Sequence, residues 1–340
     1  MGVAQTHSIR PLNMIRGLAA LMVVVSHLSG MGYLPKGIMS GQHGVLIFFV
    51  LSGFLMEYLY GKTDMARASV VSDFMVRRFF RIVPLVFFVV ILSLVVNWAV
   101  KTDFFYRFSL SEAWSALFLI SDYSVFWTIT VETKFYLFVP FVFFFLAGCE
   151  DKTRLIFYAL FVVLISYSVG YSVDNKTNWL MYLPSFAGGL LAGHIYRMFF
   201  FRLSPKYSTL LFFLSSIILI ATIPGVSRLV WREAFLVWDY QLLMVIIVAC
   251  FILSSTRLIV AVDWLLANKL GDFMGAVSYS VYLIHFVIIW YVDRVLKIPR
   301  EESLLAVIGI LLAIYIVSSV TYLLFERPFI RLGKLGLSRP

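Results

Sequence analysis

Ten apolar segments, each long enough to cross a lipid bilayer, constrain this 340-residue chain more than any other feature of its sequence. A membrane-spanning helix needs about 20 predominantly apolar residues. Such segments lie at residues 12–34, 43–61, 75–99, 129–148, 154–173, 179–199, 207–224, 235–254, 273–296 and 303–325. A shorter apolar piece, 113–121, is expected to be an interfacial or re-entrant helix. The sequence therefore predicts an all-α fold, a polytopic membrane helix bundle of about ten transmembrane helices.

The composition leaves little chain for a soluble domain. Hydrophobic residues make up 61% of the sequence and charged residues 14%, whereas soluble domains usually carry about 25% charged residues. With a mean hydropathy of +0.94, residues 1–340 are expected to form a single membrane domain with no appended soluble domain. The net charge of +10 does not indicate nucleic acid binding, because the basic residues lie mostly between apolar segments, where they meet anionic lipid headgroups.

The distribution of lysine and arginine predicts the orientation of the chain. If the N-terminus is inside, 18 of the 28 basic residues fall on the inner side and nine on the outer side, with Lys134 within a span. Because short cytoplasmic loops are enriched in basic residues, both termini are predicted to be cytoplasmic. The two cysteines, Cys149 and Cys250, then lie at cytoplasmic helix ends and are expected to be reduced.

The first apolar segment carries two ionisable residues, Arg16 and His27, which are eleven positions apart. At about 100° and 1.5 Å per residue, both point from the same helix face, roughly 16 Å apart along the axis. Arginine stays charged, whereas histidine acts as an acid or a base near neutral pH. The pair indicates an elongated site, with a permanent positive charge at one end and an acid–base group at the other. A snorkelling arginine with a hydrogen-bonded core histidine is the structural alternative.

Three arginines, Arg77, Arg78 and Arg81, enter the third segment from the predicted cytoplasmic side. Their spacing of three and four residues places two of them on one helix face. Because positive charge at a helix start opposes the helix dipole, we expect an anion beside them. Lipid phosphate is the simpler candidate, and a phosphorylated cofactor is the more specific one.

Polar residues also interrupt the fourth and ninth segments. Glu132 shares a helix face with Tyr136 near the predicted outer end of its helix. A carboxylate within an apolar helix costs several kcal/mol unless it is paired or faces water, so we favour a functional role over a structural ion pair. In the ninth segment Ser278, Tyr282 and His285 fall on one stripe, and Tyr279 is offset by one position.

Together these residues resemble acyltransferase family 3, the integral membrane acyltransferases that O-acylate surface polysaccharides and lipopolysaccharide. The motifs occur in family order over nearly the whole chain: Arg16-Gly-Leu-Ala-Ala with His27, Phe48-Phe-Val-Leu-Ser-Gly-Phe54, Arg77-Arg-Phe-Phe-Arg81-Ile with Pro84, Trp127 with Glu132 and Phe135-Tyr136, Ser278-Tyr-Ser with Tyr282 and His285, and Glu326-Arg-Pro328. The chain departs from many relatives at Leu46, Lys134 and Val287, where they carry an acidic residue, a glutamine and a proline. These departures bear on acceptor preference more than on the chemistry.

The resemblance implies a membrane O-acyltransferase of the bacterial inner (plasma) membrane. It would move an acetyl or other short acyl group from cytoplasmic acetyl-CoA, or a related acyl-CoA, to a hydroxyl of an extracytoplasmic glycan such as lipopolysaccharide O-antigen or exopolysaccharide. The expected partners are acyl-CoA, a glycan or lipid-linked saccharide, and membrane lipids. No metal and no nucleic acid are expected. The family's essential arginine and histidine correspond to Arg16 and His27.

Acyl transfer to a hydroxyl requires a base, donors for the oxyanion and a docked leaving group. We expect His27 to be the base, Glu132 to orient it and Arg16 to act with them. The expected cofactor contacts are Arg77, Arg78 and Arg81 for the phosphates, and Ser278, Tyr279, Tyr282 and His285 for the thioester end. Direct transfer in a ternary complex is the preferred mechanism, and an acyl-histidine intermediate on His27 is the alternative.

A proton-coupled transporter is the competing class of function, because intramembrane His, Glu and Arg also build proton pathways. Two features of the sequence argue against it. The arginines cluster at one surface, and no paired broken helices recur in the two halves of the chain, as inverted repeats would require.

Overall fold

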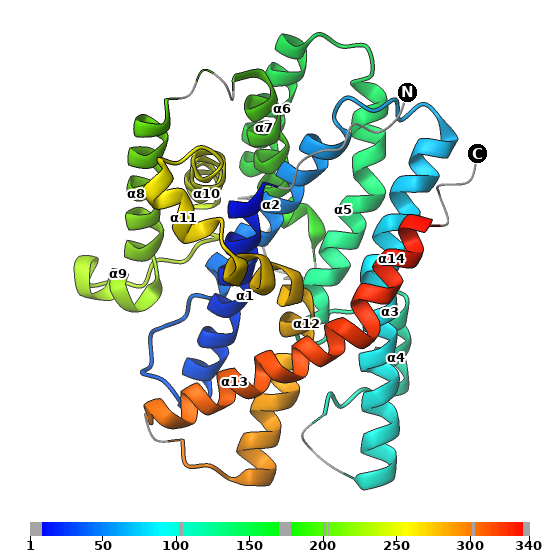
Figure 1. Cartoon of the computed structure of the whole chain (residues 1–340), viewed down its shortest axis with the longest axis vertical. Coiled ribbons are helices and arrows are strands. Elements are labelled where there is room, and N and C mark those ends of the chain that lie inside the picture. Colours follow the sequence, from blue (N-terminus) through cyan, green and yellow to red (C-terminus); the bar gives the residue numbers. More distant parts are fainter. Residues whose placement is uncertain are drawn as a thin grey trace.

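The regular structure of the chain is helical throughout the part that the computed structural model describes, which is residues 9–101, 105–169, 178–199, 202, 204–300 and 303–335 (Figure 1). The α-helices are α1 (Arg10–Gly30), α2 (Gly41–Tyr60), α3 (Ala68–Val100), α4 (Leu110–Leu117), α5 (Phe126–Phe145), α6 (Asp151–Val169), α7 (Leu183–Phe199), α8 (Pro205–Ala221), α9 (Pro224–Trp231), α10 (Gln241–Ser255), α11 (Val260–Leu266), α12 (Lys269–Tyr291), α13 (Leu304–Thr321) and α14 (Arg327–Leu335). One 3-10 turn, η1 (Trp179–Tyr182), precedes α7, and two π-helical turns, η3 (Val292–Leu296) and η4 (Tyr322–Glu326), follow α12 and α13.

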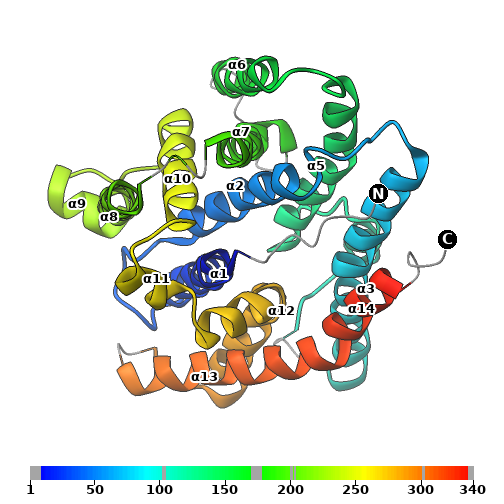
Figure 2. The same ribbon diagram turned by 45° about the horizontal axis from the view of Figure 1, so that its top comes forward.

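Helix α1 lies in the middle of the bundle, between α2 and α12 (Figure 2). It begins with Pro11 in its first turn, where proline's missing N–H costs no helical hydrogen bond. Ile15 and Val24 point from opposite sides of α1, and both are almost fully buried, whereas Leu18 is 39% exposed. Helix α1 is therefore buried over most of its surface, and its two ionisable residues are set inside the bundle.

Helices α2 and α7 form the closest packed pair of the bundle. A Cβ atom added at Gly53 would lie 2.1 Å from the carbonyl oxygen of Phe186, and one added at Gly189 would lie 2.1 Å from that of Val50. The two backbones therefore touch, as small residues allow between membrane helices. Gly275 of α12 lies in the same way against the backbone of Asn13 in α1.

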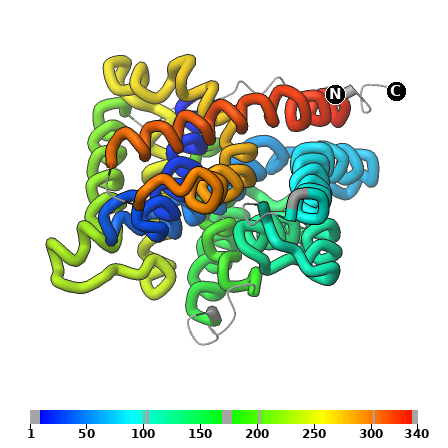
Figure 3. Tube along the Cα trace, turned by 90° about the horizontal axis from the view of Figure 1, so that it is seen from below, coloured from blue at the N-terminus to red at the C-terminus, as the bar shows by residue number. Residues whose placement is uncertain are grey.

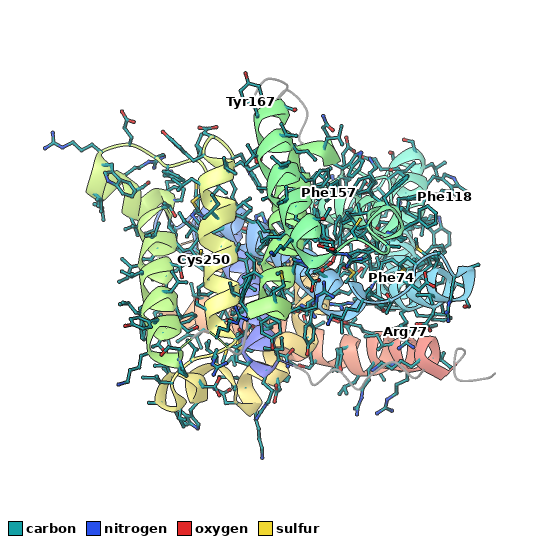
Figure 4. All side chains as sticks on the ribbon, turned by 90° about the horizontal axis from the view of Figure 1, so that it is seen from above. Phe74, Arg77, Phe118, Phe157, Tyr167 and Cys250 are labelled. Carbon is teal, nitrogen blue, oxygen red and sulfur yellow. The ribbon has the colours of Figure 1, made fainter. Side chains whose placement is uncertain are left out.

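Helices α3, α13 and α14 form the opposite edge of the bundle and expose most of their surface. In the most apolar window of α3 only 33% of the residues are buried, and in that of α13 and α14 only 28%. Figure 3 shows α13 and α14 as one continuous rod along a side of the molecule. Large apolar side chains also project from the other outer helices, as Figure 4 shows for Phe118 and Phe157. Such a surface requires an apolar solvent, which a lipid bilayer provides.

All ten predicted segments contain a helix, but the count of ten membrane spans is not confirmed. Among the described residues, six helices are long and apolar enough to cross a membrane, within 10–30, 41–60, 68–99, 126–145, 260–296 and 304–334. A seventh is possible if α8 and α9, which meet at 85°, form one broken span. Helices α7, with 17 residues, and α10, with 15, are shorter than a full span, since sequence hydropathy also counts the apolar turns and loops that flank them.

The predicted interfacial or re-entrant piece is the short helix α4. Ser109 and Glu112 form a capping box at its start, in which each side chain bonds the other's backbone N–H. The chain that leads into α4 enters the bundle, where the hydroxyl of Tyr106 donates to the carbonyl oxygen of Leu283 at 2.9 Å. Burial raises the pKa of Tyr106 well above its ordinary value, so this hydroxyl stays protonated and remains a donor.

Candidate active site

Five helices, α1, α2, α3, α5 and α12, line one cavity. Eight of its thirteen lining residues have polar or charged side chains, which is unusual for the interior of a helix bundle this apolar. The lining residues are Arg16, Val45, Phe48, Phe49, Ser52, Arg81, Ile82, Thr128, Ile129, Glu132, Ser278, Tyr279 and Tyr282. Six residues that the sequence analysis selected line this one cavity, although they come from α1, α3, α5 and α12.

Arg16 and Arg81 present guanidinium groups to the cavity without a direct partner. Within the described residues neither side chain makes a hydrogen bond or an ion pair, although both interact electrostatically with Glu132 across the cavity. Each guanidinium keeps its charge and carries five N–H donors. Two unpaired cations inside a membrane protein are costly, so the cavity is built to receive an anion or the oxygen of a polarised carbonyl.

Glu132 is held by neighbours other than the predicted one. Its Oε1 accepts the hydroxyl of Ser52 at 2.7 Å and the hydroxyl of Tyr136. Sequence analysis expected Glu132 to orient His27, but no contact between the two exists in the described structure. Glu132 instead belongs with Arg16 and Arg81 in the cavity. Counting residues along the sequence does not show that α5 begins inside the bundle, where Val125 and Thr128 contact Tyr282.

The three arginines of α3 lie in three different environments. Arg77 pairs with Asp73 one turn earlier, at 2.9 Å, and its side chain is 37% exposed; Figure 4 shows it between α3 and α14. Arg78 lies over the rings of Tyr60, Phe74 and Tyr136, at 5.9, 5.6 and 5.2 Å from their centroids. Of the three, only Arg81 lines the cavity. The structure therefore does not bring the three guanidiniums together, because Asp73 holds Arg77 and aromatic rings hold Arg78.

The predicted polar residues of α12 lie against the cavity. Their hydroxyl protons already form hydrogen bonds within the protein. The hydroxyl of Ser278 donates to the carbonyl of Gly275 at 2.9 Å, and that of Tyr279 to the carbonyl of Ile82 at 3.1 Å. Tyr282 accepts the hydroxyl of Thr128 at 2.8 Å. What these side chains still offer to a ligand is oxygen lone pairs. On one side of the cavity the arginine side chains can only donate hydrogen bonds. On the α12 side the hydroxyl oxygens mainly accept them.

His27 does not line the cavity but lies beside it, on the far side of Tyr282. Its ring stacks on that of His285, with centroids 5.2 Å apart, and contacts Phe286 at 4.3 Å. Tyr282 connects this pair to the cavity, 6.1 Å from His285 between ring centroids. Arg16 therefore lies in the cavity with Glu132, whereas His27 lies farther along α1, beside His285.

His285 has a defined tautomer. Its Nδ1 lies 2.8 Å from the carbonyl oxygen of Tyr282 and 3.2 Å from that of Val281, so Nδ1 carries the proton. Its Nε2 then carries a lone pair, and this buried nitrogen has no partner among the described residues. His27 is half-buried and makes only ring contacts there. The two imidazoles differ, since His285 is fixed by hydrogen bonds to the backbone and His27 makes no hydrogen bond within the described residues.

Three polar side chains shape this region without having been predicted as site residues. Ser52, known only as part of the Phe48–Phe54 motif, and Thr128, in an apolar run, both line the cavity. Glu326 lies in η4, accepts the hydroxyl of Ser280 at 2.8 Å and interacts electrostatically with Arg81. For Glu326 the available signal was a carboxylate at the end of an apolar segment, in the motif Glu326-Arg-Pro328.

A second buried polar group lies away from the cavity, at the junction of α2, α6 and α7, and we call it the Glu57 cluster: Glu57, Tyr158, His194 and Arg197. Glu57 accepts from Tyr158 at 2.9 Å, from His194 at 3.0 Å and from Arg197. Glu57 and His194 are completely buried. Within the described ranges, no three His, Cys, Asp or Glu side chains converge to hold a metal ion, here or elsewhere.

Comparison with known proteins gives a consistent result. The family model described as an acyltransferase domain matches residues 10–323. A protein of Acidianus two-tailed virus that is provisionally named an acetyltransferase is 25% identical over 95% of this chain and 92% of its own length. A protein of Staphylococcus aureus strain COL, provisionally named an O-acetyltransferase, is 24% identical over 96% of this chain. The peptidoglycan O-acetyltransferase OatA of Listeria monocytogenes is 24% identical over 94% of it.

The chain spans little more than half of the two bacterial relatives, 58% of the Staphylococcus protein and 55% of OatA. No solved structure matches it. The similarity covers the whole helix bundle and the cavity within it.

Proposed function

Because the chain belongs to acyltransferase family 3, as its match over residues 10–323 shows, we propose that it transfers an acetyl or other short acyl group from acyl-CoA to a hydroxyl of a glycan outside the cytoplasm. The observation that carries this proposal is the cavity with its two unpaired guanidiniums, Arg16 and Arg81. A thioester carbonyl that becomes an oxyanion during attack is the kind of group that such donors stabilise. Relatives named as O-acetyltransferases, one of them for peptidoglycan, support a carbohydrate acceptor.

The proposed reaction proceeds by direct transfer. The acyl-CoA thioester lies in the cavity with its carbonyl oxygen toward Arg16 and Arg81. The acceptor hydroxyl loses its proton to His27 as its oxygen attacks the carbonyl carbon. The C–S bond then breaks, and the proton held by His27 passes to the leaving thiolate, which gives free CoA and the O-acyl ester. Glu132 balances the charge of the two arginines while the cavity fills.

An acyl group carried on His27 is the second route for the same net reaction. His27 would attack the thioester, release CoA, and pass the acyl group to the glycan hydroxyl in a separate step. Exchange of label between CoA and acetyl-CoA without any acceptor would support this route, because only a covalent intermediate allows it.

The proposed location is the bacterial inner membrane with both termini in the cytoplasm, supported by the two-to-one bias of basic residues. A cysteine placed at Lys36 should then react with an impermeant maleimide in intact cells. The native Cys149 and Cys250, which are free and half-buried, should react only after lysis. Labelling of Lys62→Cys but not Lys36→Cys in intact cells would reverse the orientation.

Incubation of the purified protein with radiolabelled acetyl-CoA and de-O-acetylated cell-surface glycan tests the proposal. We expect label in the glycan as an alkali-labile ester, together with one free CoA thiol per ester formed. The same protein after His27→Ala substitution is the control for non-enzymatic transfer. Binding of acetyl-CoA without any ester, or proton flux in vesicles without acceptor, would instead favour the transporter class.

A further inference from the structure

The cavity has an apolar end as well as a charged one. Helix α2 presents one face to it, on which Val45, Phe49 and Ser52 follow one another at spacings of four and three residues. The hydroxyl of Ser52 donates to Glu132 of α5 at 2.7 Å, so this part of the face belongs to the charged residues. About one turn before these two residues, Phe49 and Ile129 line the cavity with apolar side chains. We call Val45, Phe49 and Ile129 the apolar end.

The apolar end lies on one side of the charged residues because α2 and α5 run in the same direction. The guanidinium of Arg154 donates to the carbonyl oxygens of Gly61 and Leu146, the residues that directly follow α2 and α5. Both helices therefore end at one level, on the predicted cytoplasmic side. Since Ser52 contacts Glu132, the residues that precede them on the two helices also lie side by side. The apolar end is thus displaced from Glu132 toward the predicted outer side.

The wall behind the apolar end has no room to retreat. Phe49 is almost fully buried, and its ring centroid lies 4.7 Å from that of Phe186 and 5.4 Å from that of Tyr182. The ring of Phe186 in turn stacks on Phe135 at 4.1 Å. One turn after Phe49, the backbone of α2 at Gly53 touches the backbone of Phe186 in α7, which lies beside α2 in Figure 2. A close-packed wall of this kind admits an extra methylene only by shifting rings or main chain.

The orientation of the donor brings its acyl group to this wall. In the proposed reaction the thioester carbonyl lies at Arg16 and Arg81, and CoA reaches it from the cytoplasmic side. The group on the other side of the carbonyl carbon then points away from the arginines, into the apolar end. A methyl group gains from burial there, whereas a longer chain must displace the ring of Phe49. We propose that the apolar end binds the acyl group of the donor, and that Phe49 is the specificity-determining residue that restricts this group to acetyl.

The test compares acyl-CoA donors of increasing length. The purified protein receives acetyl-CoA, propionyl-CoA or butyryl-CoA with an excess of de-O-acetylated cell-surface glycan, and kcat/KM is measured from the acceptor-dependent release of CoA thiol. Phe49→Leu widens the apolar end while it keeps an apolar side chain. Phe54→Leu is the matched control, because Phe54 is an equally buried residue of α2 that packs against Tyr58 and Tyr196 and does not line the cavity.

We expect the wild-type protein to use propionyl-CoA at least tenfold less efficiently than acetyl-CoA, because one methylene in an apolar pocket changes kcat/KM by about 10–200-fold. Butyryl-CoA should be used less efficiently again. Phe49→Leu should raise the propionyl-to-acetyl ratio of kcat/KM about tenfold, since it returns space for one methylene. Val45→Ala should raise the ratio by a smaller factor, and Phe54→Leu should leave it at the wild-type value. A purely structural role would lower kcat/KM for all donors together and would not move the ratio.

A wild-type protein that uses butyryl-CoA as efficiently as acetyl-CoA would overturn the inference, and this result needs no variant. So would an unchanged ratio in Phe49→Leu, or an equal change in Phe54→Leu. If Phe49→Leu does not yield folded protein, Val45→Ala decides in the same way. The inference rests on the proposed function, whose failure would show separately, as a wild-type protein that forms no glycan ester from any of the three donors, and that result would overturn the inference with it.

Discussion

The cavity and the Glu57 cluster both place arginine, glutamate and histidine inside the helix bundle, but they arrange these residues differently. In the Glu57 cluster the carboxylate accepts from Tyr158, His194 and Arg197, and none of these four residues lines the cavity. In the cavity the arginines make no direct contact with Glu132, and space for a ligand separates them. The Glu57 cluster is held together by hydrogen bonds among its own members, whereas the charged residues of the cavity stay apart.

The difference indicates how to recognise function among charges in a membrane protein. Two buried residues of opposite charge that hydrogen-bond each other hold their helices together. Removing one of them leaves the charge of the other uncompensated. Charges that remain apart around a cavity bring no such benefit to the fold, and they are retained for what enters between them. Mutations in the Glu57 cluster should therefore mainly lower stability, and mutations in the cavity should mainly lower transfer activity.

The largest effect is expected for the two histidines. His27→Ala should lower the rate of acetyl transfer by about 10²–10⁴-fold, the usual cost of losing a general base, without lowering the thermal midpoint in detergent. His194→Ala should lower the midpoint but leave kcat per folded molecule within a few fold. Wild-type turnover by His27→Ala would place the base elsewhere, and His285 would become the candidate.

The two glutamates should differ mainly in stability. Glu57→Ala should destabilise the protein by about 3–5 kcal/mol, because it leaves Arg197 buried without its carboxylate. Glu132→Gln should change stability little, since the amide oxygen can still accept from Ser52, while transfer falls because the charge facing the arginines is gone. Thermal unfolding and transfer assays on both variants provide the measurement. Equal destabilisation by both would remove the distinction between the two groups.

Among the arginines of α3, Arg81→Ala should weaken binding of acetyl-CoA by about 1.5–3 kcal/mol, the range for a hydrogen bond to a charged group. Arg77→Ala, which removes the partner of Asp73 and leaves the cavity lining unchanged, should leave the affinity within twofold. Titration of CoA into the detergent-solubilised variants measures both. Normal binding by Arg81→Ala would exclude the cavity as the donor site.

The smallest effect is expected at His285. Asparagine keeps a donor for the carbonyl of Tyr282 but removes the Nε2 lone pair, so His285→Asn should fold normally and lose about 1–3 kcal/mol in kcat/KM if a ligand donor uses that nitrogen. His285→Gln, which offers an oxygen near the position of Nε2, should lose less. If both variants are as active as wild type, the unpaired nitrogen has no role in transfer.

Much of the fold could be predicted from the sequence, because each apolar segment carries its own helix. The number of spans could not, since hydropathy does not distinguish the 17-residue α7 from a full crossing once apolar flanks are counted. The bend of 85° between α8 and α9 follows from Pro224 in the first turn of α9, and it is not visible in a hydropathy profile.

The residues that line the cavity could be predicted from the sequence better than the contacts between them. Arg16, Arg81, Glu132 and Tyr282 were selected because charged or polar residues in apolar helices are costly, and all four line the cavity. Their pairings depend on contacts between distant helices, which one sequence does not reveal. Spacing alone therefore placed Glu132 beside His27 and could not show that Ser52 holds it.

Backbone contact at Gly53, Gly189 and Gly275 has a consequence for how this protein could diversify. Together with Gly44 of α2, where an added Cβ would lie 2.5 Å from the carbonyl oxygen of Ala19 in α1, it joins α7, α2, α1 and α12 into a slab in which a methyl group added at any of these glycines would collide with a neighbouring main chain. Helices α3 and α5, which close the cavity from the other side, meet their neighbours at far fewer positions. Selection for a new acceptor would therefore act on α3, α5 and the cavity-facing side chains of α12, while the glycine contacts of the slab would tolerate almost no change. A mutational library confined to the first set should yield altered specificities, and one confined to the glycines should yield mainly unfolded protein.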